Sequence, residues 1–342
     1  MQSKVLLIYT GGTIGMNRNP RTGALEPFDF EHLLSQVPEL EQFQTEIATY
    51  QFSPPIDSSD MSPELWIQLA RIIADSYGSY DGFVVLHGTD TMAFTASMLS
   101  FMLQDLSKPV IFTGSQLPIG MLRTDGKENL ITSIEMAAAK HQDGTPMVPE
   151  VCVYFNGHLM RGNRTTKQSA DEFNAFESFN YPHLADAGVQ ITYHDEFIHH
   201  PDHRRQLKVH CRLDPNVLIM SLFPGFREDL MRHIINTPGL RAIVLRTYGS
   251  GNAPQNPWLY STLKEACQRG KVIINISQCL QGRVEMGRYD TGYHLQEAGV
   301  ISGYDGTVES AVTKLMFLQG KYDDVEQVRK FMRQSICGEI TV

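Results

Sequence analysis

Two turns rich in glycine and threonine, each directly after a short apolar run, constrain this chain most. The first turn, TGGTIG over residues 10–15, follows the apolar run 5–9. The second turn, HGTDTM over residues 87–92, follows the apolar run 83–86. Short apolar runs bounded by glycine predict strands that are buried on both faces, as in a parallel sheet.

The two turns are predicted to meet in one pocket. Ligands of open parallel sheets bind beyond the carboxyl ends of the strands, so Thr13, Thr89 and Asp90 should converge there. Two hydroxyl groups and a carboxylate in one site favour nucleophilic chemistry on a carbonyl carbon. Simpler interpretations exist, because the first turn could only reverse the chain and Thr89 and Asp90 could only cap a helix. The first turn lacks the GxGxxG spacing of a dinucleotide site.

The composition excludes several classes of function. The chain has 342 residues, with 29 basic against 38 acidic side chains and a net charge of −9, so no nucleic-acid or acidic-membrane partner is expected. No apolar run is long enough to span a bilayer, and the first one is too short for a signal peptide. Five scattered cysteines without a CxxC pair predict neither a zinc site nor disulfides, which fits a reducing, cytoplasmic location.

Alternating strand and helix patterns predict two α/β domains with parallel sheets. The larger, N-terminal catalytic domain is expected over 1–194 and the smaller, C-terminal domain over 217–342. The polar segment 195–216 contains two prolines and is predicted to be a linker. Predicted strands cover 5–9, 83–87, 109–113, 151–155, 242–246 and 272–276. One predicted helix begins at Ser62–Pro63, and the others cover 92–103, 129–139, 257–269, 307–319 and 324–335.

Histidine is concentrated in and beside the predicted linker. The residues concerned are His194, His199, His200, His203 and His210. Their spacing matches no metal-ligand motif, so no metal site is predicted.

Two polar segments supply further candidates for the pocket. In RGNRTTK over 161–167, Lys167 could activate a hydroxyl if burial or nearby positive charge kept its amine neutral; the alternative is a solvated basic loop. In DSSD over 57–60, Asp57 suits the ammonium group of an α-amino acid, and Ser58 suits its carboxylate. The alternative is turn and capping chemistry, for which Ser62 alone would be enough. Ser115, after the strand 109–113, has the same two interpretations.

These residues bring the chain close to a known family. TGGTI over 10–14 and HGTDT over 87–91 resemble the two signature motifs of bacterial-type L-asparaginases. The resemblance covers nearly the whole chain and is closest to the cytoplasmic type I enzymes. Further similar segments are IDSSDM (56–61), TGSQ (113–116), RGNRTTK (161–167), LRTYG (245–249) and GNAPQ (251–255).

The resemblance implies hydrolysis of L-asparagine to L-aspartate and ammonia, without a cofactor, by a homodimer or homotetramer. It implies that Thr13 is the nucleophile and that Thr89, Asp90 and Lys167 form a second hydroxyl–acid–base group. Which threonine attacks first stays open. The substrate-binding residues that it implies are Asp57, Ser58, Ser59, Thr89, Asp90 and Ser115.

One departure from the family pattern concerns the loop 16–27. Family members often carry a tyrosine there, whereas this loop has none, and Ala24 or Leu25 lies near that place. The loop contains glycine and proline and could still close as a lid. Tyr289, from this chain or a partner subunit, is the candidate that assists Thr13; the alternative is a packing tyrosine in a surface loop.

A second, regulatory site is predicted in the C-terminal half. Arg246, Ser277, Gln278 and Cys279 follow predicted strands, and Arg246 could hold a carboxylate. With Thr166, they resemble the effector site of allosteric type I asparaginases, in which asparagine is the activator. The alternative is that Arg246 pairs with an acid and Cys279 is a buried core residue.

Two rival functions fit parts of this pattern. A non-catalytic amino-acid sensor would need the pocket but not a base beside a hydroxyl. The amidotransferase subunit that releases ammonia for aminoacyl-tRNA carries an N-terminal extension, whereas the first strand here is expected from about residue 4. The acidic balance also provides no surface for tRNA.

Overall fold

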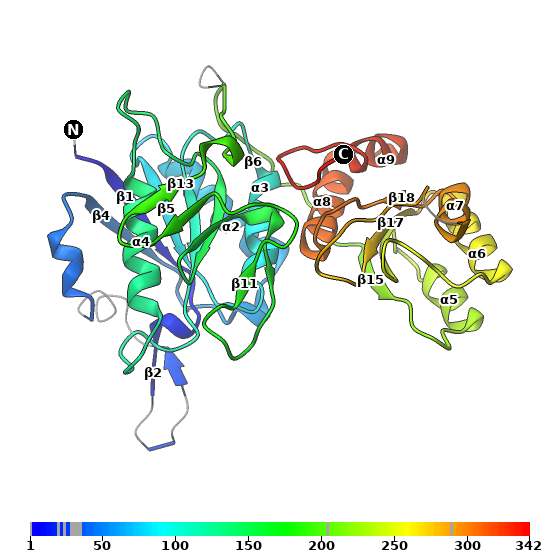
Figure 1. Cartoon of the computed structure of the whole chain (residues 1–342), viewed down its shortest axis with the longest axis horizontal. Helices are drawn as coiled ribbons and strands as arrows, with labels where there is room; N and C mark the ends of the chain where they lie inside the picture. The colour runs from blue at the N-terminus through cyan, green and yellow to red at the C-terminus, as the bar shows by residue number, and fades with distance from the viewer. Residues whose placement is uncertain (1, 19–20, 23–24, 28–35, 203–204, 288–289) are drawn as a thin grey trace. The chain divides into compact units, whose positions relative to one another are not determined.

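The computed structural model in Figure 1 describes residues 2–18, 21–22, 25–27, 36–202, 205–287 and 290–342. The chain divides into two compact units, Met1–Val209 and His210–Val342. This boundary lies inside the segment 195–216. The first part of that segment contributes the 3-10 turn η5 (Asp195–Phe197) and strand β14 (Lys208–Val209) to the first unit.

The first unit is built on an eight-stranded sheet with a parallel centre. The central strands are β1 (Lys4–Tyr9), β5 (Gly82–Leu86), β7 (Val110–Thr113) and β8 (Val151–Phe155), close to the predicted bounds. Their side chains are almost all buried on both faces, which explains why continuous apolar runs encode them. The order across the sheet is β13-β12-β9-β8-β7-β5-β1-β4.

The two edges of this sheet were not anticipated from the sequence. The strand β4 (Glu46–Gln51) pairs parallel with β1 at one edge. At the other edge, β9 (His158–Arg161), β12 (Ala185–Ala187) and β13 (Ile191–Tyr193) pair antiparallel. Most side chains of β4, β12 and β13 are partly or fully exposed, so these strands carry no continuous apolar run.

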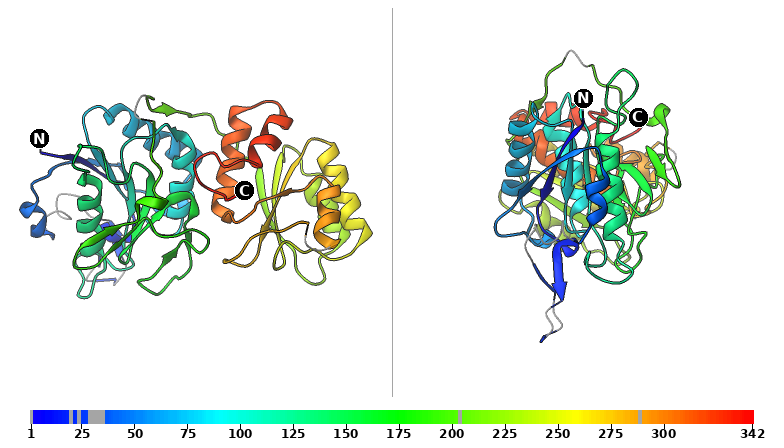
Figure 2. Two further views of the ribbon diagram at one scale, coloured as in Figure 1. Left: turned by 45° about the horizontal axis from the view of Figure 1, so that its top comes forward. Right: turned by 90° about the vertical axis from the view of Figure 1, so that its left-hand side faces the viewer.

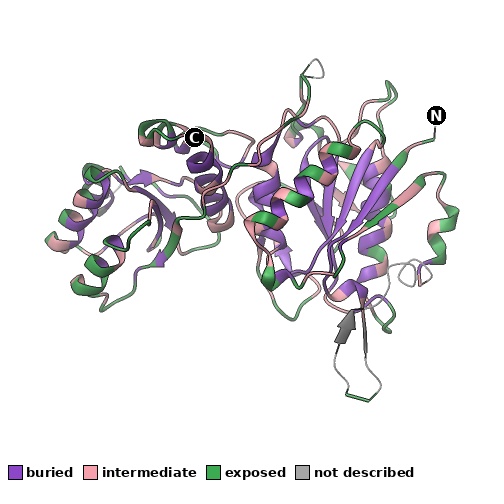
Figure 3. Cartoon of the chain, turned by 180° about the vertical axis from the view of Figure 1, so that it is seen from behind, coloured by how far each residue is buried: buried purple, intermediate pink, exposed green. Residues whose placement is uncertain are grey.

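Helices cover both faces of the sheet. The helix α4 (Gly126–Ala138) packs Leu130 and Ile134 against alternate residues of the central strands. The helices α2 (Pro63–Ser76) and α3 (Met92–Met102) pack together and cover the other face, as Figures 1 and 3 show. The purple strands of Figure 3 mark the buried core between these layers. Nine of the eleven residues of α3 are buried, as its apolar sequence predicts.

The second unit has a smaller parallel sheet, so both predicted α/β domains are confirmed. Its strands are β15 (Val217–Ser221), β16 (Ala242–Thr247), β17 (Val272–Ser277) and β18 (Ile301–Ser302), in that order. Figure 2 shows helices on both sides of this sheet. The helices α5 (Glu228–Ile235), α6 (Pro257–Gln268) and α7 (Asp290–Glu297) share one core, and α8 (Val308–Lys321) and α9 (Val325–Met332) pack on the other side.

Short elements complete the described part of the chain. They are β2 (Met16–Arg18), β3 (Leu25–Pro27), β6 (Leu103–Gln104), β10 (Thr166–Lys167) and β11 (Phe176–Glu177), with the 3-10 turns η1 (Thr13–Gly15), η2 (Pro38–Gln42), η3 (Ser58–Asp60) and η4 (Gly162–Arg164). The helices within these residues include none that combines the length and the apolar character needed to cross a lipid bilayer.

Candidate active site

Close backbone contacts join the two threonine turns at the carboxyl ends of β1 and β5. A methyl group on Gly12 would lie only 2.5 Å from Cα of Gly88, so the two turns touch through glycines. Gly12 has a φ of 95°, a conformation that side chains disfavour. A methyl group on Gly11 would lie 2.1 Å from the carbonyl oxygen of Ile56, directly before Asp57. Three segments that the sequence singled out therefore meet here.

Thr89, Asp90 and Lys167 form one hydrogen-bonded group. Nζ of Lys167 lies 2.9 Å from Oγ1 of Thr89 and 2.7 Å from Oδ1 of Asp90. Thr89 is buried, whereas the Asp90 side chain is 65% exposed. The capping residue of α3 is Thr91, and its hydroxyl donates to the carbonyl oxygen of Ser58 at 2.6 Å. Thr89 and Asp90 are thus not the cap of this helix.

The segment that carries Lys167 is held in place by buried charges. Nε of Arg161 donates to Oε2 of Glu150 at 2.6 Å, and both side chains are 7% exposed. The guanidinium groups of Arg161 and Arg164 also lie 4.4 and 5.0 Å from the ring centre of Tyr181. The interpretation of residues 161–167 as a solvated basic loop is therefore wrong. The buried ion pair fixes the chain shortly before β10, and Lys167 of β10 contacts Thr89.

Asp57 makes structural hydrogen bonds and is also exposed to solvent. It is the N-cap of η3, where one carboxylate oxygen accepts from the backbone N–H and from the hydroxyl of Ser59, each at 2.9 Å. These hydrogen bonds lower the pKa of Asp57, the backbone N–H of Ser59 contributing most, so the carboxylate is ionised near neutral pH. Capping therefore involves Asp57, and not Ser62 alone as the sequence suggested. Ser58 is buried beside Gly88, and the Ser59 hydroxyl is already engaged.

Ser115 lies after β7, near the first threonine turn. Its hydroxyl donates to the carbonyl oxygen of Leu117 at 2.6 Å, and its side chain is buried. The backbone N–H of Ile119 donates to the carbonyl oxygen of Ile14 at 3.2 Å, which ties the loop of Ser115 to the turn that follows Thr13. Ser115 is thus fixed at the same edge of the sheet as the other candidates.

Sequence analysis missed a buried chain of hydrogen bonds behind the second turn. Nε1 of Trp66 donates to Oγ1 of Thr95 at 2.9 Å, and the Thr95 hydroxyl lies 3.0 Å from Nε2 of His87. Nδ1 of His87 lies 2.7 Å from the carbonyl oxygen of Gly88. The chain is consistent if Thr95 donates to Nε2 and the neutral imidazole donates from Nδ1. His87 stands in the HGTDT motif, and that position is the signal that could have identified it.

Burial lowers the pKa of His87 to about 4, from an ordinary value of 6.5. The unfolded chain therefore binds this proton more tightly than the folded protein does, and folding stability falls as the pH drops below 6.5. Between pH 7 and pH 5, we expect His87 to remove about 2 kcal/mol from the free energy of unfolding. Urea unfolding of the wild type and His87→Asn at both pH values measures this, because the variant lacks the titration. An equal loss of stability in both proteins would contradict it.

Tyr289 lies outside the described residues, as do Gly23 and Ala24 of the loop 16–27. The contribution of that tyrosine to the site therefore stays a prediction.

The predicted regulatory residues of the second unit cluster at the ends of β16 and β17. Nε of Arg246 is buried and has no hydrogen-bond partner among the residues that the structure describes. The side-chain amide of Gln278 donates to the carbonyl oxygens of Leu222 and Arg246, at 2.6 and 3.0 Å. Cys279 is exposed, so its interpretation as a buried core residue is wrong.

The other two predicted regulatory residues are Ser277 and Thr166. The hydroxyl of Ser277 donates to the carbonyl oxygen of Gly249 at 2.6 Å and accepts from the backbone N–H of Cys279 at 2.9 Å, which shapes the loop. Thr166 belongs to the first unit, where it is buried and pairs in register with Glu177.

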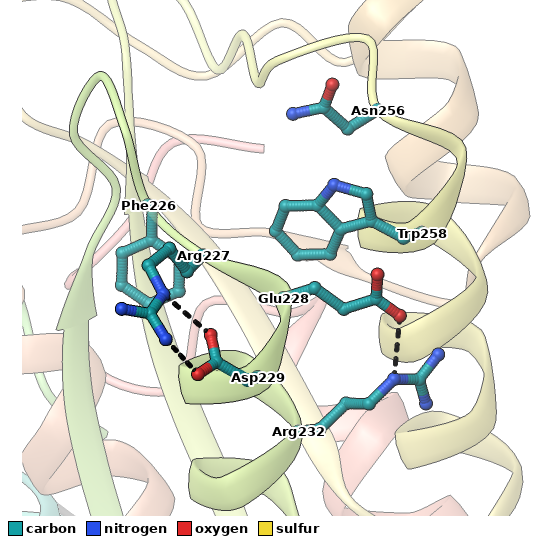
Figure 4. A pocket seen from close by; sticks show the side chains of 7 residues that line it. All are labelled: Phe226, Arg227, Glu228, Asp229, Arg232, Asn256 and Trp258. Carbon is teal, nitrogen blue, oxygen red and sulfur yellow. Dashed lines mark hydrogen bonds and ion pairs between the residues drawn. The ribbon is translucent and has the colours of Figure 1, made fainter.

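A depression of about 500 Å³ in the second unit, drawn in Figure 4, involves other residues. Its two arginines already face carboxylates: Nε of Arg227 lies 2.9 Å from Oδ1 of Asp229, and Nε of Arg232 lies 2.8 Å from Oε1 of Glu228. The charges in its lining are therefore compensated, and the depression offers less to an anion than the unpaired Nε of Arg246 does.

Comparisons with known proteins agree across the whole chain. The family profile described as "Asparaginase, N-terminal" matches residues 4–199, and "Glutaminase/Asparaginase C-terminal domain" matches 216–332. L-asparaginase 1 of Escherichia coli is 43% identical over 343 residues, covering 100% of this chain and 99% of that protein. The crystal structure of L-asparaginase I from Vibrio cholerae matches with a TM-score of 0.91 at 41% identity, covering 100% of both chains. The thermostable L-asparaginase from Thermococcus kodakarensis matches with a TM-score of 0.89 at 34% identity, covering 99% of both chains.

Proposed function

Since the chain belongs to the asparaginase family, we propose that it hydrolyses L-asparagine to L-aspartate and ammonia through a threonine acyl-enzyme. The observation that carries this proposal is the contact of 2.9 Å between Nζ of Lys167 and Oγ1 of Thr89, at the carboxyl ends of the strands, where the turn of Thr13 also lies. A protein that only binds an amino acid has no need for an amine beside a hydroxyl.

In the proposed reaction, Oγ1 of Thr13 attacks the side-chain amide carbon of asparagine and loses its proton. The C–N bond breaks, and the nitrogen leaves as ammonia after taking up a proton. Water then attacks the aspartyl ester, which releases aspartate and restores the Thr13 hydroxyl. Splitting the hydrolysis in two lets a hydroxyl of ordinary acidity react, provided that a neighbouring base takes its proton.

Thr89, Asp90 and Lys167 are proposed to transfer protons in this sequence. The amine of Lys167 lies within hydrogen-bond distance of the Thr89 hydroxyl, which is the reach that a general base requires. Asp90 accepts from the same amine at 2.7 Å and so holds it in position. Tyr289 is proposed to assist Thr13 in place of the tyrosine that the loop 16–27 lacks.

Asp57, Ser58, Ser59, Asp90 and Ser115 are proposed to bind the substrate. The ionised carboxylate of Asp57 and the carboxylate of Asp90 suit the α-ammonium group of asparagine. The buried hydroxyl of Ser58 suits its α-carboxylate, and Ser59 holds Asp57. No cofactor takes part in the proposed reaction.

Gly88→Ala tests the binding of the α-carboxylate. A methyl group at this position would lie 2.5 Å from Oγ of Ser58, so the serine side chain must move. Loss of one hydrogen bond to a charged group costs about 1.5–3 kcal/mol, and we expect KM for asparagine to rise about 10- to 100-fold. Gly78→Ala is the matched control, because nothing lies within 4 Å of its added methyl group. Similar KM values in both variants would argue against this assignment.

A coupled assay of ammonia release from L-asparagine and L-glutamine tests the proposed activity. We expect turnover of asparagine by the purified chain without any added cofactor. Asparagine binding without ammonia release would indicate the sensor function instead and would refute hydrolysis. The assay also measures the preference between the two amides, for which one methylene is worth about 1–3 kcal/mol.

We also propose that asparagine activates the enzyme, with Arg246, Ser277, Gln278 and Cys279 of the second unit and Thr166 of the first unit as the residues involved. The unpaired Nε of Arg246 supports a carboxylate ligand, since a buried donor without a partner is costly. Thr166 directly precedes Lys167 in β10, so a ligand that moves Thr166 would move the proposed base. Coupling of this kind is typically about 1–3 kcal/mol, or about 5- to 150-fold in affinity.

Arg246→Ala tests this regulation. We expect the wild type to show a sigmoidal dependence of rate on asparagine concentration, and Arg246→Ala and Cys279→Ala to lose the sigmoidal shape. The measurement is a steady-state saturation curve for each protein. A hyperbolic wild-type curve that neither substitution alters would remove the regulatory site.

The oligomeric state and the cellular location are also proposed because the chain belongs to the asparaginase family. We propose a homodimer or homotetramer in the cytoplasm, with no nucleic-acid or membrane partner. None of the five cysteines, all of which lie in the described residues, forms a disulfide, which suits a reducing compartment.

A further inference from the structure

Three histidines surround one aspartate at the antiparallel edge of the first sheet. The register of β9 and β12 puts His158 directly opposite Asp186. His194 follows β13, whose Tyr193 pairs with Ala185 beside the aspartate, and His183 lies just before β12. The strand pairing therefore gathers side chains that are up to 36 positions apart, His158 and His194 being the outermost.

The imidazoles and the carboxylate of this histidine cluster are in direct contact. Nδ1 of His158 lies 2.7 Å and Nδ1 of His183 lies 3.2 Å from Oδ1 of Asp186. Nε2 of His194 lies 2.8 Å from Oδ2 of Asp186. The ligand atoms that His158, His183 and Asp186 offer all lie within 4.8 Å of one another. These side chains are 23–44% exposed, so an ion in solution can reach them.

His183 carries the most informative contacts. Its second ring nitrogen, Nε2, lies 2.8 Å from Oε1 of Glu177, so both of its nitrogens face carboxylates. The ring of His158 lies against it, tilted by 33°, with ring centres 4.3 Å apart. With a metal ion at Nδ1, the ring of His183 would carry its proton on Nε2 and donate it to Glu177.

We propose that His158, His183 and Asp186 bind a divalent transition-metal ion of the zinc type through Nδ1, Nδ1 and Oδ1. Imidazole and carboxylate are the donors that Zn²⁺ takes, and tetrahedral zinc ligands at about 2.0–2.1 Å from the metal lie about 3.3 Å apart. The separations of 2.7 and 3.2 Å from Oδ1 are close to that value. The metal ion takes the place of a proton on each Nδ1. A neutral ring then carries its single proton on Nε2, whereas an imidazolium ring releases its Nδ1 proton to solvent and keeps the proton on Nε2.

Glu177 and His194 complete the site as orienting groups. Glu177 accepts from Nε2 of His183, which is the carboxylate–histidine–metal arrangement that selects the ring tautomer. His194 contacts the other carboxylate oxygen of Asp186 and so turns Oδ1 toward the metal. Only His194 belongs to the histidines that sequence analysis weighed as metal ligands, and the site therefore differs from a metal site in that segment.

Titration of the purified chain with Zn²⁺, followed by calorimetry and by thermal unfolding, tests the proposal. We expect one tight Zn²⁺ per chain, a rise of the unfolding temperature with Zn²⁺, and visible absorption of a tetrahedral Co²⁺ complex. His183→Gln and His158→Gln should each weaken binding at least tenfold, and Glu177→Gln should weaken it about 10- to 100-fold. His200→Gln is the matched control, because this exposed histidine lies outside the cluster.

Each outcome of the zinc titrations either supports or overturns the proposed site. Selective loss in the His158, His183 and Glu177 variants supports the site. No zinc binding by the wild type overturns it, and so does equal affinity in the wild type and all variants. Loss of binding in His200→Gln but not in His183→Gln would assign the metal to the segment 195–216 and also overturn it. None of these readouts depends on hydrolytic activity.

Discussion

Thr13→Ala and Thr89→Val are each expected to lose at least about 10³-fold in kcat for asparagine while the protein stays folded. Thr13 is the proposed nucleophile, and without its hydroxyl no aspartyl ester can form. Thr89 is the hydroxyl that contacts Lys167 at 2.9 Å, and valine keeps its shape but cannot transfer a proton. The measurement is ammonia release by each variant, with thermal unfolding to verify the fold.

Intact-protein mass spectrometry adds the order of attack. If Thr13 attacks first and the Thr89–Lys167 pair activates water, Thr89→Val should accumulate an aspartyl ester and Thr13→Ala should not. The opposite pattern would make Thr89 the first nucleophile. Thr237→Ala is the matched control, since this threonine is exposed and lies in the second unit. Normal turnover in Thr13→Ala and Thr89→Val would refute the threonine mechanism.

Lys167→Met is expected to abolish activity with little change in stability. General base catalysis contributes about 10²–10⁴-fold, and the loss in kcat should fall in or above this range. The ion pair of Lys167 with Asp90 involves a carboxylate that is 65% exposed, and such pairs contribute only about 0–1 kcal/mol to folding. The unfolding temperature should therefore stay close to that of the wild type.

Two further variants distinguish a base from a mere positive charge. Lys167→Arg keeps the charge, but a guanidinium cannot give up its proton in a protein, so this variant should also be inactive. Lys140→Met is the matched control, because Lys140 forms a partly exposed ion pair with Asp81 at 2.9 Å. If Lys167→Arg turned over asparagine normally, Lys167 would supply charge and not act as the base.

The centre of the first sheet and the positions of the threonines were predictable from local sequence. Strands β1, β5, β7 and β8 are buried on both faces, and burial of this kind demands the apolar runs that revealed them. The polar turns stand directly after two of these strands, and topology then places them at one edge. The strands β12 and β13 were not predicted because most of their side chains are partly or fully exposed and show no periodic apolar pattern. They are defined by pairing with neighbouring strands.

The sequence by itself determined the two α/β units, the central strands and the threonine turns, because apolar periodicity and glycine act within a few residues of the chain. Only the tertiary structure decided which distant groups meet. Lys167 reaches Thr89 across 78 positions, Gly12 touches Gly88, and three histidines gather around Asp186. Such pairs depend on how whole elements pack against one another, and no local pattern records that packing.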